Sequence, residues 1–319
     1  MSLSRRHSHA PRHGRSPTYD RKVTLADLAN RLGQYDGELV VGPPSRGPGN
    51  WAGAPSAVCV DNVVWLAYRL RRPVGGGRGY ANVIARSEDG VRFEEVARLT
   101  SDEFGAASLE RPALVTRPEG GWRVYVSCAT HGSKHWWVET VDAEELEKLP
   151  AGERRMILPG DKTSAWKDVV VHAGGLGWRM WACRHPLDGG DDEADRMETW
   201  YAVSADGLYW TVRSRALGPQ AGAWDARGTR ITAVVEADGC WYAFYDGRAT
   251  AAQNWREHTG LARGYSPDTF PARSPLVGAD EPTLRYVSVV EVGGGYRAYM
   301  EVEADDGTHE LRTVCVARP

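Results

Sequence analysis

One hairpin pattern recurs five times along the chain. In each copy an apolar run leads into a short turn, and the returning strand carries two aromatic residues three positions apart. The five pairs begin at Trp65, Trp122, Trp178, Trp241 and Tyr296, in steps of 57, 56, 63 and 55 residues. A repeat of this length, built from strands and turns, is typical of an all-β, five-bladed β-propeller. The alternative is a β-sandwich in which the aromatic spacing is coincidental.

The repeats predict one folded domain, residues 23–319, after a tail. Residues 1–22 are basic, rich in His, Ser and Arg, and lack the apolar segment of a secretory signal, so we expect a disordered tail. The expected blades cover residues 51–99, 107–158, 165–217, 223–275 and 283–319. Residues 38–41 are expected to close the ring as a strand of the last blade, because closure removes exposed strand edges. Thr24 is expected to cap a short helix that ends at Leu32.

Composition and charge argue against several classes of function. The net charge of −3 does not suit nucleic-acid binding, and no apolar run approaches the ~20 residues of a membrane span. Five cysteines are scattered one to a blade, which favours reduced thiols and a cytoplasmic protein. No Cys/His spacing requires a metal or another cofactor. A structural cation among the many acidic residues, or a metal on His7, His9 and His13 of the tail, remains an alternative.

Charged residues stand at or just before the start of four of the five apolar inner strands. They are Glu110 and Arg111 in blade two, Asp168 in blade three, Asp225 and Arg227 in blade four, and Arg285 in blade five. Blade one has Ala54 at this place. Inner strands line the central funnel of a propeller, so such a charge requires either a buried ion pair or a binding site.

A second polar set stands where second strands end and third strands begin. It comprises Arg69, His131, Arg184, His185, Asp246, Arg248, Glu301, Glu198, Glu257 and His309. For any single member a structural ion pair is an equally good explanation. The regular placement of the whole set across the blades favours a shared polar ligand site.

Two short segments, Glu110-Arg111-Pro112 and Lys167-Asp168-Val169-Val170, together with the blade count and the period, carry a family resemblance. Through them the chain resembles the five-bladed propeller glycoside hydrolase superfamily, which includes families 32, 43, 62 and 130. The resemblance covers about residues 50–319. It implies a central funnel that binds a small carbohydrate or sugar-like metabolite, and cleavage of a glycosidic bond.

Glycosidic cleavage uses two carboxyl groups, one a protonated acid and the other a base or nucleophile. The resemblance implies Asp168, Asp225 and Glu110 as catalytic residues, and Asp168→Asn is expected to abolish activity with little loss of folding. The residues implied to bind the substrate are Arg111, His131, Arg227, Asp246, Arg248, Arg285, Glu301 and His309. The chain departs from the family at Ala54, where the family has an aspartate before the proline.

That departure leaves alternatives open. Glu110 or Glu301 replaces the missing base, or the chain resembles the phosphorylase branch, in which one acid suffices and arginines hold a phosphate nucleophile. Alternatively, the propeller binds a sugar or another metabolite without cleaving it. It is also compatible with an enzyme that modifies a small non-sugar metabolite in the same funnel, since a fold does not dictate a function.

Overall fold

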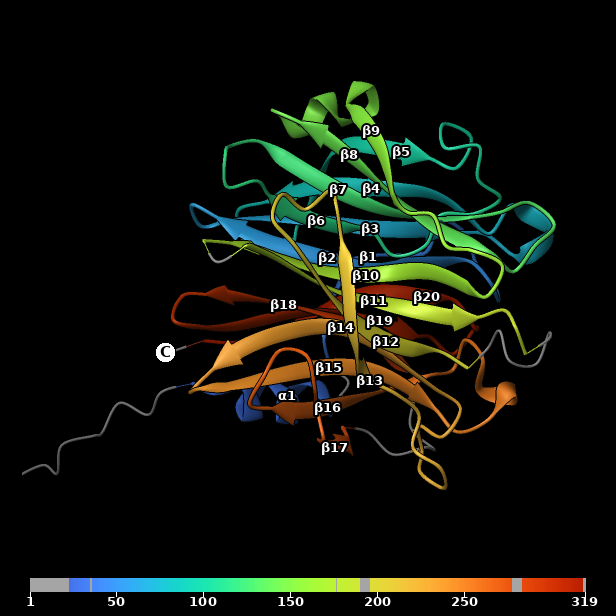
Figure 1. Ribbon diagram of the computed structural model, residues 1–319. Helices are drawn as coiled ribbons and strands as arrows, with labels where there is room; N and C mark the ends of the chain where they lie inside the picture. Colours follow the sequence, from blue (N-terminus) through green and yellow to red (C-terminus); the bar gives the residue numbers. More distant parts are fainter. Residues whose placement is uncertain (1–22, 35, 176, 190–195, 277–282, 318–319) are drawn as a thin grey trace, which may run out of the picture.

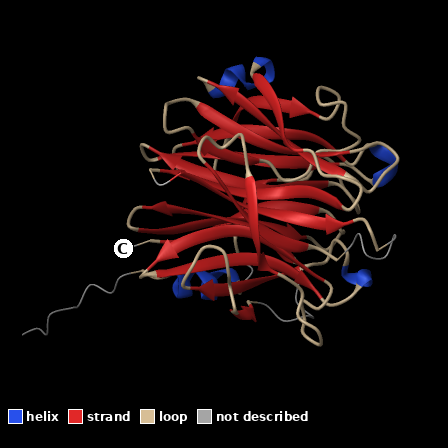
Figure 2. Cartoon of the chain, viewed as in Figure 1, coloured by secondary structure: helices blue, strands red, loops and turns tan. Residues whose placement is uncertain are grey.

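The computed structural model describes residues 23–34, 36–175, 177–189, 196–276 and 283–317. Figure 2 shows that these residues form mainly strands, with a few short helices at the periphery. The predicted tail, residues 1–22, lies outside the described residues.

The described strands group into five antiparallel units of four, which we number as blades one to five (Figure 1). Blade one contains β2 (Trp51–Val60), β3 (Val63–Arg71), β4 (Gly79–Ser87) and β5 (Glu94–Thr100). Blade two contains β6 (Ala113–Thr116), β7 (Trp122–Ala129), β8 (Trp136–Ala143) and β9 (Glu153–Leu158). Blade three contains β10 (Ser164–Gly174), β11 (Gly177–Pro186), β12 (Glu198–Ser204) and β13 (Thr211–Leu217).

The last two blades follow the same order. Blade four contains β14 (Gly228–Ala237), β15 (Cys240–Arg248), β16 (His258–Gly264) and β17 (Ala272–Pro275). Blade five contains β18 (Leu284–Val292), β19 (Gly295–Glu303) and β20 (His309–Val316), with β1 (Glu38–Val41) antiparallel to β20. Among the described residues, the short 3-10 helices η1, η2 and η4 span Val74–Gly76, Leu146–Ala151 and Ala251–Gln253.

The innermost strands form a ring. β2 contacts β6, β6 contacts β10, β10 contacts β14, β14 contacts β18, and β18 returns to β2. The predicted all-β propeller is therefore confirmed. β1 lies beside β20, where residues 38–41 were expected, but its contribution to holding the ring closed stays a prediction.

Inner strands carry a bulge near their start. The pairing with the second strand shifts between Gly53 and Ser56 in blade one, and between Lys167 and Val170 in blade three, with equivalent shifts in blades four and five. Residues with positive φ occupy three of these bulges: Ala54 at 52°, Asp168 at 51° and Tyr286 at 54°. Because a bulge bends the strand and redirects its side chains, it turns these positions toward the propeller axis.

The paired aromatics that revealed the repeat pack the blades. The second member of each pair is buried: Tyr68, Tyr125, Trp181, Phe244 and Tyr299. Two of the tyrosines also join neighbouring blades, because their hydroxyls donate 2.8 Å hydrogen bonds to the Gly207 and Gly90 carbonyls. Both carbonyls belong to Asp-Gly turns, Asp89-Gly90 and Asp206-Gly207.

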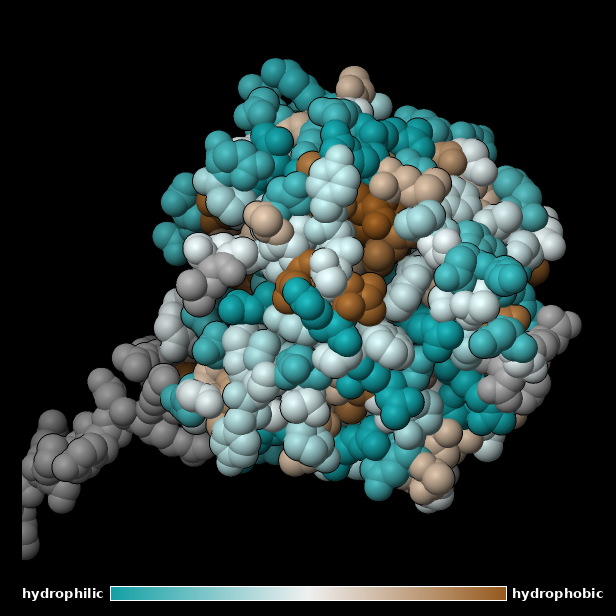
Figure 3. Space-filling view, in the orientation of Figure 1, coloured by the Kyte–Doolittle hydropathy of each residue, from teal (hydrophilic) through white to brown (hydrophobic). Residues whose placement is uncertain are grey.

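The predicted helix is α1 (Leu25–Leu32). Thr24 and Asp27 form a reciprocal capping box at its start, and Gly33 caps its end. Its apolar side packs on the core of blade five through Leu28 and Leu32. In the described ranges no helix has both the length and the apolar character that a membrane crossing needs. The face of the molecule in Figure 3 is mostly hydrophilic, with hydrophobic side chains gathered near its middle.

Candidate functional site

A cavity of about 360 Å³ lies where the inner strands begin, and side chains from all five blades line it. We call it the central cavity. Its lining includes Trp51, Arg69 and Arg78 of blade one, Glu110, Lys134 and Trp136 of blade two, Lys167, His185 and Met197 of blade three, Arg230, Arg248, Asn254, Trp255 and Glu257 of blade four, and Arg285 and Tyr286 of blade five. This volume is in the lower part of the range of about 300–1,000 Å³ that is common for small-molecule sites.

Cations outnumber carboxylates on the wall of the central cavity. Its cationic side chains are Arg69, Arg78, Lys134, Lys167, Arg230, Arg248 and Arg285, and its carboxylates are Glu110 and Glu257. Because low-dielectric walls strengthen the field of such a group of charges, the cavity favours an anionic ligand.

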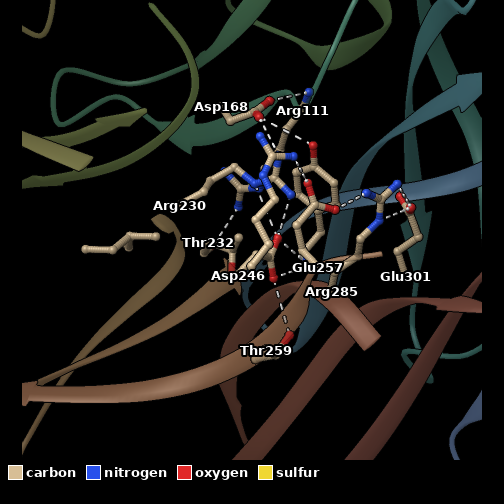
Figure 4. A network of polar contacts seen from close by, with 12 residues as sticks. Arg111, Asp168, Arg230, Thr232, Asp246, Glu257, Thr259, Arg285 and Glu301 are labelled. Carbon is tan, nitrogen blue, oxygen red and sulfur yellow. Dashed lines mark hydrogen bonds and ion pairs between the residues drawn. The ribbon is translucent and has the colours of Figure 1, made fainter. Parts of the chain in front are cut away.

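Asp168 lies at one end of the polar network in Figure 4 and contacts several groups of the cavity wall. Its Oδ2 atom lies 3.3 Å from Arg230 Nη1 and 3.6 Å from Lys167 Nζ, and accepts a 3.4 Å hydrogen bond from the Tyr286 hydroxyl. Its Oδ1 atom accepts a 3.2 Å hydrogen bond from the Arg111 backbone N–H. Burial alone would raise the pKa of Asp168, but Lys167, Arg230 and other cations hold this pKa at about 2. Asp168 is therefore ionised, and it holds Lys167, Arg230 and Tyr286 in place at the wall of the cavity.

Lys167 is a buried amine on the cavity wall. Its Nζ atom lies 4.6 Å from the centre of the Trp136 ring as well as close to Asp168. Burial is the main reason that its pKa falls to about 8, while the Asp168 carboxylate acts in the opposite direction. A lysine with this pKa carries an appreciable neutral fraction near pH 7–8, so it is capable of accepting a proton.

Arg230 joins two buried carboxylates of different blades. It contacts Asp168, and its Nη2 atom donates a 2.8 Å hydrogen bond to Asp246 Oδ2. The guanidinium also lies 3.8 Å from the centre of the Tyr286 ring. Burial raises the pKa of Asp246 to about 6, although Arg230 opposes the shift. Asp246 also accepts hydrogen bonds from the backbone N–H of Tyr286, so it lies directly behind the wall of the cavity.

A second network joins blades four, five, one and two. Arg285 Nη1 lies 2.6 Å from Glu257 Oε2, and its Nη2 lies 2.7 Å from Glu301 Oε1. Arg69 reaches Glu301 at 3.1 Å and also pairs with Glu110. Despite burial, Arg285 with Arg230 and Arg248 holds the pKa of Glu257 well below the usual range for a glutamic acid. Arg285 with Arg69 does the same for the pKa of Glu301.

Glu301 lies close to the position where the family has its blade-one acid. A Cβ atom on Gly53 would lie 2.1 Å from Glu301 Oε2, so only glycine fits there. Glu301 is fully buried, and His309 Nδ1 lies 2.7 Å from its other oxygen. A carboxylate with so low a pKa is a weak base, and the geometry does not favour Glu301 as a replacement for the aspartate absent at Ala54.

Arg111 lies on the axis, beneath the central cavity. Its guanidinium donates hydrogen bonds to the backbone carbonyls of Pro55, Val169 and Thr232, at 3.1, 2.6 and 2.9 Å. These carbonyls come from blades one, three and four, so Arg111 ties inner strands together across the ring. It lines a different cavity, of about 490 Å³, at the other end of the inner strands.

The other predicted site residues lie apart from the central cavity. Asp225 is fully buried within blade four, 3.0 Å from Arg273 Nη1, and accepts a hydrogen bond from Tyr245. Arg227 is buried, and its backbone N–H donates to the carbonyl of Arg248. His131 is exposed on a loop, and other residues of that loop, not His131, reach the cavity.

The structure thus brings together part of the predicted set. Glu110, Arg248 and Arg285 line the cavity. Four more predicted residues stand behind its wall: Asp168, Asp246, Glu301 and His309. Sequence reasoning included Arg69 and Glu257 in its second polar set without assigning them a catalytic or substrate-binding role. It did not select Lys167, Arg230, Arg78 or Tyr286. A signal was present, because Glu110, Lys167, Arg230 and Arg285 occupy equivalent places at the starts of successive blades.

No group of three or more His, Cys, Asp or Glu side chains in the described part of the chain is arranged to hold a metal ion. The carboxylates near the cavity instead have arginine or lysine partners.

Comparison with known proteins gives matches through structure alone. No family model and no curated protein matches the sequence. A thermostable family-43 glycoside hydrolase superposes with a TM-score of 0.62 at 10% identity, covering 87% of this chain and 92% of that protein. An α-L-arabinofuranosidase from Lactobacillus brevis gives 0.62 at 13% identity, covering 83% and 90% of the two proteins. A GH43_1 enzyme from Xanthomonas citri, complexed with xylotriose, gives 0.59 at 12% identity over 91% and 92%.

The fold is that of the propeller glycoside hydrolases. The resemblance predicted from the repeat and from residues 110–112 and 167–170 is thereby confirmed for the fold. Identities this low carry no information about which residues of a glycoside hydrolase propeller are retained, so the function has to be argued from the central cavity itself.

Proposed function

We propose that the central cavity binds a small sugar or sugar-like metabolite that carries a carboxylate or phosphate group. The observation that carries this proposal is the excess of cations: seven line the wall, against two carboxylates on it and three directly behind it, Asp168, Asp246 and Glu301. Guanidinium groups bind planar carboxylates and phosphates through paired hydrogen bonds. Trp51, Trp136 and Trp255 also line the cavity, and amphipathic aromatic rings of this kind are suited to packing against a sugar ring.

The residues of the central cavity suit binding of such a ligand better than they suit its hydrolysis by two carboxyl groups. Such hydrolysis needs one carboxylic acid that stays protonated near neutral pH, which requires a raised pKa. The pKa of Asp168 is about 2, and that of Glu257 is lowered by Arg285 and other arginines. Glu110 contacts Arg69, and Asp225 lies away from the cavity. None of these four carboxyl groups is thus placed as a protonated acid facing the cavity. Burial raises the pKa of Asp246 to about 6, but this residue lies behind the wall, where it accepts hydrogen bonds from Arg230 and the Tyr286 N–H.

A binding experiment tests the proposal. We expect D-galacturonate or glucose 6-phosphate to give measurable heat in titration calorimetry, and neutral D-galactose to give none. The double variant Arg78→Gln/Lys134→Gln should weaken binding by about tenfold or more, since a charge-assisted hydrogen bond contributes about 1.5–3 kcal/mol. Arg92→Gln is the matched control, because the side chain of Arg92 is 89% exposed on an outer turn. Equal affinity for galactose and galacturonate would refute the proposal.

One observation favours a second candidate function, cleavage by elimination. Lys167 and Tyr286 converge on the same oxygen of Asp168 and both line the cavity. In elimination, neutral Lys167 would take the proton from the carbon next to the ligand carboxylate while an arginine neutralises that carboxylate. The electron pair forms a carbon–carbon double bond, the glycosidic C–O bond at the next carbon breaks, and the leaving oxygen gains a proton from the Tyr286 hydroxyl.

Product analysis separates this reaction from hydrolysis. Elimination from a galacturonate oligosaccharide gives an unsaturated product that absorbs ultraviolet light, and hydrolysis gives saturated products heavier by one water. We expect Lys167→Gln to abolish the unsaturated product, while calorimetric binding stays measurable at reduced affinity because the arginines of the wall remain. Saturated products from the wild type would exclude elimination, and an absence of any product would leave recognition as the function of the site.

A further inference from the structure

A second cavity, of about 320 Å³, adjoins the central cavity and contains an arginine with unusual surroundings. We call it the side cavity. It shares Trp51, Val74, Asn254 and Trp255 with the central cavity, so the two are separated by common side chains rather than by a blade. Arg71, the last residue of β3, lines the side cavity and not the central one.

Arg71 is buried, and none of the residues that the structure describes forms an ion pair with it. The residue is only 2% exposed, and its Nε and Nη1 atoms have no hydrogen-bond partner among the described residues. The guanidinium is held between two tryptophan rings, 3.7 Å from the centre of Trp51 and 4.9 Å from that of Trp255. Burying a charged group without a partner is far more costly than burying a paired one, so this arrangement needs an explanation.

The charges around Arg71 do not supply that partner. Burial, together with Arg69, Arg285 and Arg78, lowers the pKa of Arg71 to about 9, and Glu301 is the acid that acts in the other direction. Both Glu301 oxygens already have partners: Arg285 and the His309 ring contact one, and Arg69 contacts the other. Glu303, the carboxylate that lines the side cavity, pairs with Arg256 and accepts a hydrogen bond from Thr283.

Trp255 adds an independent sign of a binding surface. This residue is 46% exposed, although tryptophan is usually largely buried. It also has a φ of 72°, a left-handed conformation that is unfavourable for a bulky side chain and that often marks ligand-binding positions. The strained backbone presents the ring at the boundary of the two cavities.

We propose that the side cavity is a second anion subsite, in which Arg71 receives an acidic group from a sugar unit next to the one in the central cavity. The unpaired N–H donors of Arg71 define the anion position, and Trp255 packs against the sugar ring. The inference rests on the proposed function in that one ligand spans both cavities. It narrows the ligand class to an oligosaccharide with acidic groups on neighbouring units.

Titration of galacturonate and of digalacturonate tests the subsite. We expect the wild type to bind the dimer more tightly than the monomer, and Arg71→Gln to reduce dimer affinity by about tenfold to a hundredfold, the effect of one charge-assisted contact. Monomer affinity should change by less than about twofold, since Arg71 does not line the central cavity. Arg72→Gln is the matched control, because this neighbouring arginine is exposed and lies over Tyr80 outside the cavity.

A thermal-unfolding experiment on the ligand-free protein shows whether a loss of dimer binding in an Arg71 variant comes from a folding defect. Arg71→Met keeps an apolar stem between the two tryptophans and removes an uncompensated charge, so its melting temperature should equal or exceed that of the wild type. Sodium sulfate is expected to raise the melting temperature of the wild type more than that of Arg71→Met. A lower melting temperature for Arg71→Met in the absence of anions would assign Arg71 a structural role and overturn the proposal.

The outcomes distinguish this inference from the proposed function. Monomer binding with no effect of Arg71→Gln on the dimer overturns the side subsite and leaves the central site intact. If neither sugar binds, but sulfate raises the melting temperature of the wild type more than that of Arg71→Met, the proposed function is overturned and an anion site at Arg71 is supported. If neither sugar binds and sulfate stabilises the two proteins equally, the proposed function and the side subsite are both overturned.

Discussion

The replacement Asp168→Asn is predicted to cost stability, contrary to the expectation from sequence that it would spare folding. Asp168 is fully buried, and one of its oxygens lies within 3.6 Å of both Lys167 Nζ and Arg230 Nη1. Asparagine keeps the shape but removes the charge that compensates these two cations. The wild-type carboxyl has a pKa of about 2 against an ordinary value of 3.8, a difference that corresponds to about 2 kcal/mol.

Asp168→Asn is therefore expected to lower the free energy of unfolding at pH 7 by about 2–4 kcal/mol. The upper part of this range allows for the cost of leaving a buried cation incompletely paired. Because the pKa is lowered in the folded state, the contribution is complete above about pH 4 and disappears as the pH falls through 2. Protonated Asp resembles Asn, so the two proteins should converge in acid. About half of the difference should remain at pH 3.

Urea unfolding followed by tryptophan fluorescence at pH 7, 5 and 3 measures this difference. Asp61→Asn is the control, since Asp61 is exposed in a turn with a φ of 50° that asparagine tolerates. A variant as stable as the wild type at pH 7 would refute the reasoning. So would a deficit of the same size at pH 7 and pH 3, because that deficit would not come from the carboxylate charge.

Three further perturbations test the scaffold. Tyr299→Phe should cost about 1 kcal/mol in urea unfolding, because it removes the hydrogen bond to the Gly90 carbonyl, whereas Tyr265→Phe, at a residue 80% exposed, should cost nothing measurable. Gly53→Ala should lower the melting temperature sharply, since its Cβ atom would lie 2.1 Å from Glu301 Oε2; an unchanged melting temperature would contradict this packing. Deleting β1 should lower the melting temperature by several degrees if its pairing with β20 holds the ring closed, and a null effect would remove that role.

The fold was accessible from sequence because its signal is local and repeated. A pair of aromatics three residues apart lies on each second strand, and both its spacing and its recurrence are visible without coordinates. The capping box of α1 is equally local, since it needs only Thr24 and Asp27 three residues apart. Patterns that lie within one strand or one helical turn can be recognised directly in the amino-acid sequence.

The site was accessible only in part. Residues at the start of an inner strand could be assigned to the axis, which placed Glu110, Asp168 and Arg285 at or directly behind the cavity. Asp225 looked equivalent, but it precedes its strand and packs outward against Arg273 of the outermost strand of its blade. Whether a loop residue turns toward the axis or back into its blade depends on contacts that no periodicity encodes.

The sequence by itself determined the repeat, the secondary structure and the positions at which charges enter the inner strands. Ring closure decided which charges of different blades meet, because ion pairs such as Arg69 with Glu301 and Arg230 with Asp168 join residues that are far apart in the chain. The same closure removes the Lys167 amine from water and buries Arg71 with no acidic partner among the described residues. Desolvation depends on the sum of neighbours in three dimensions, so the chemistry of this cavity is a property of the assembled blades.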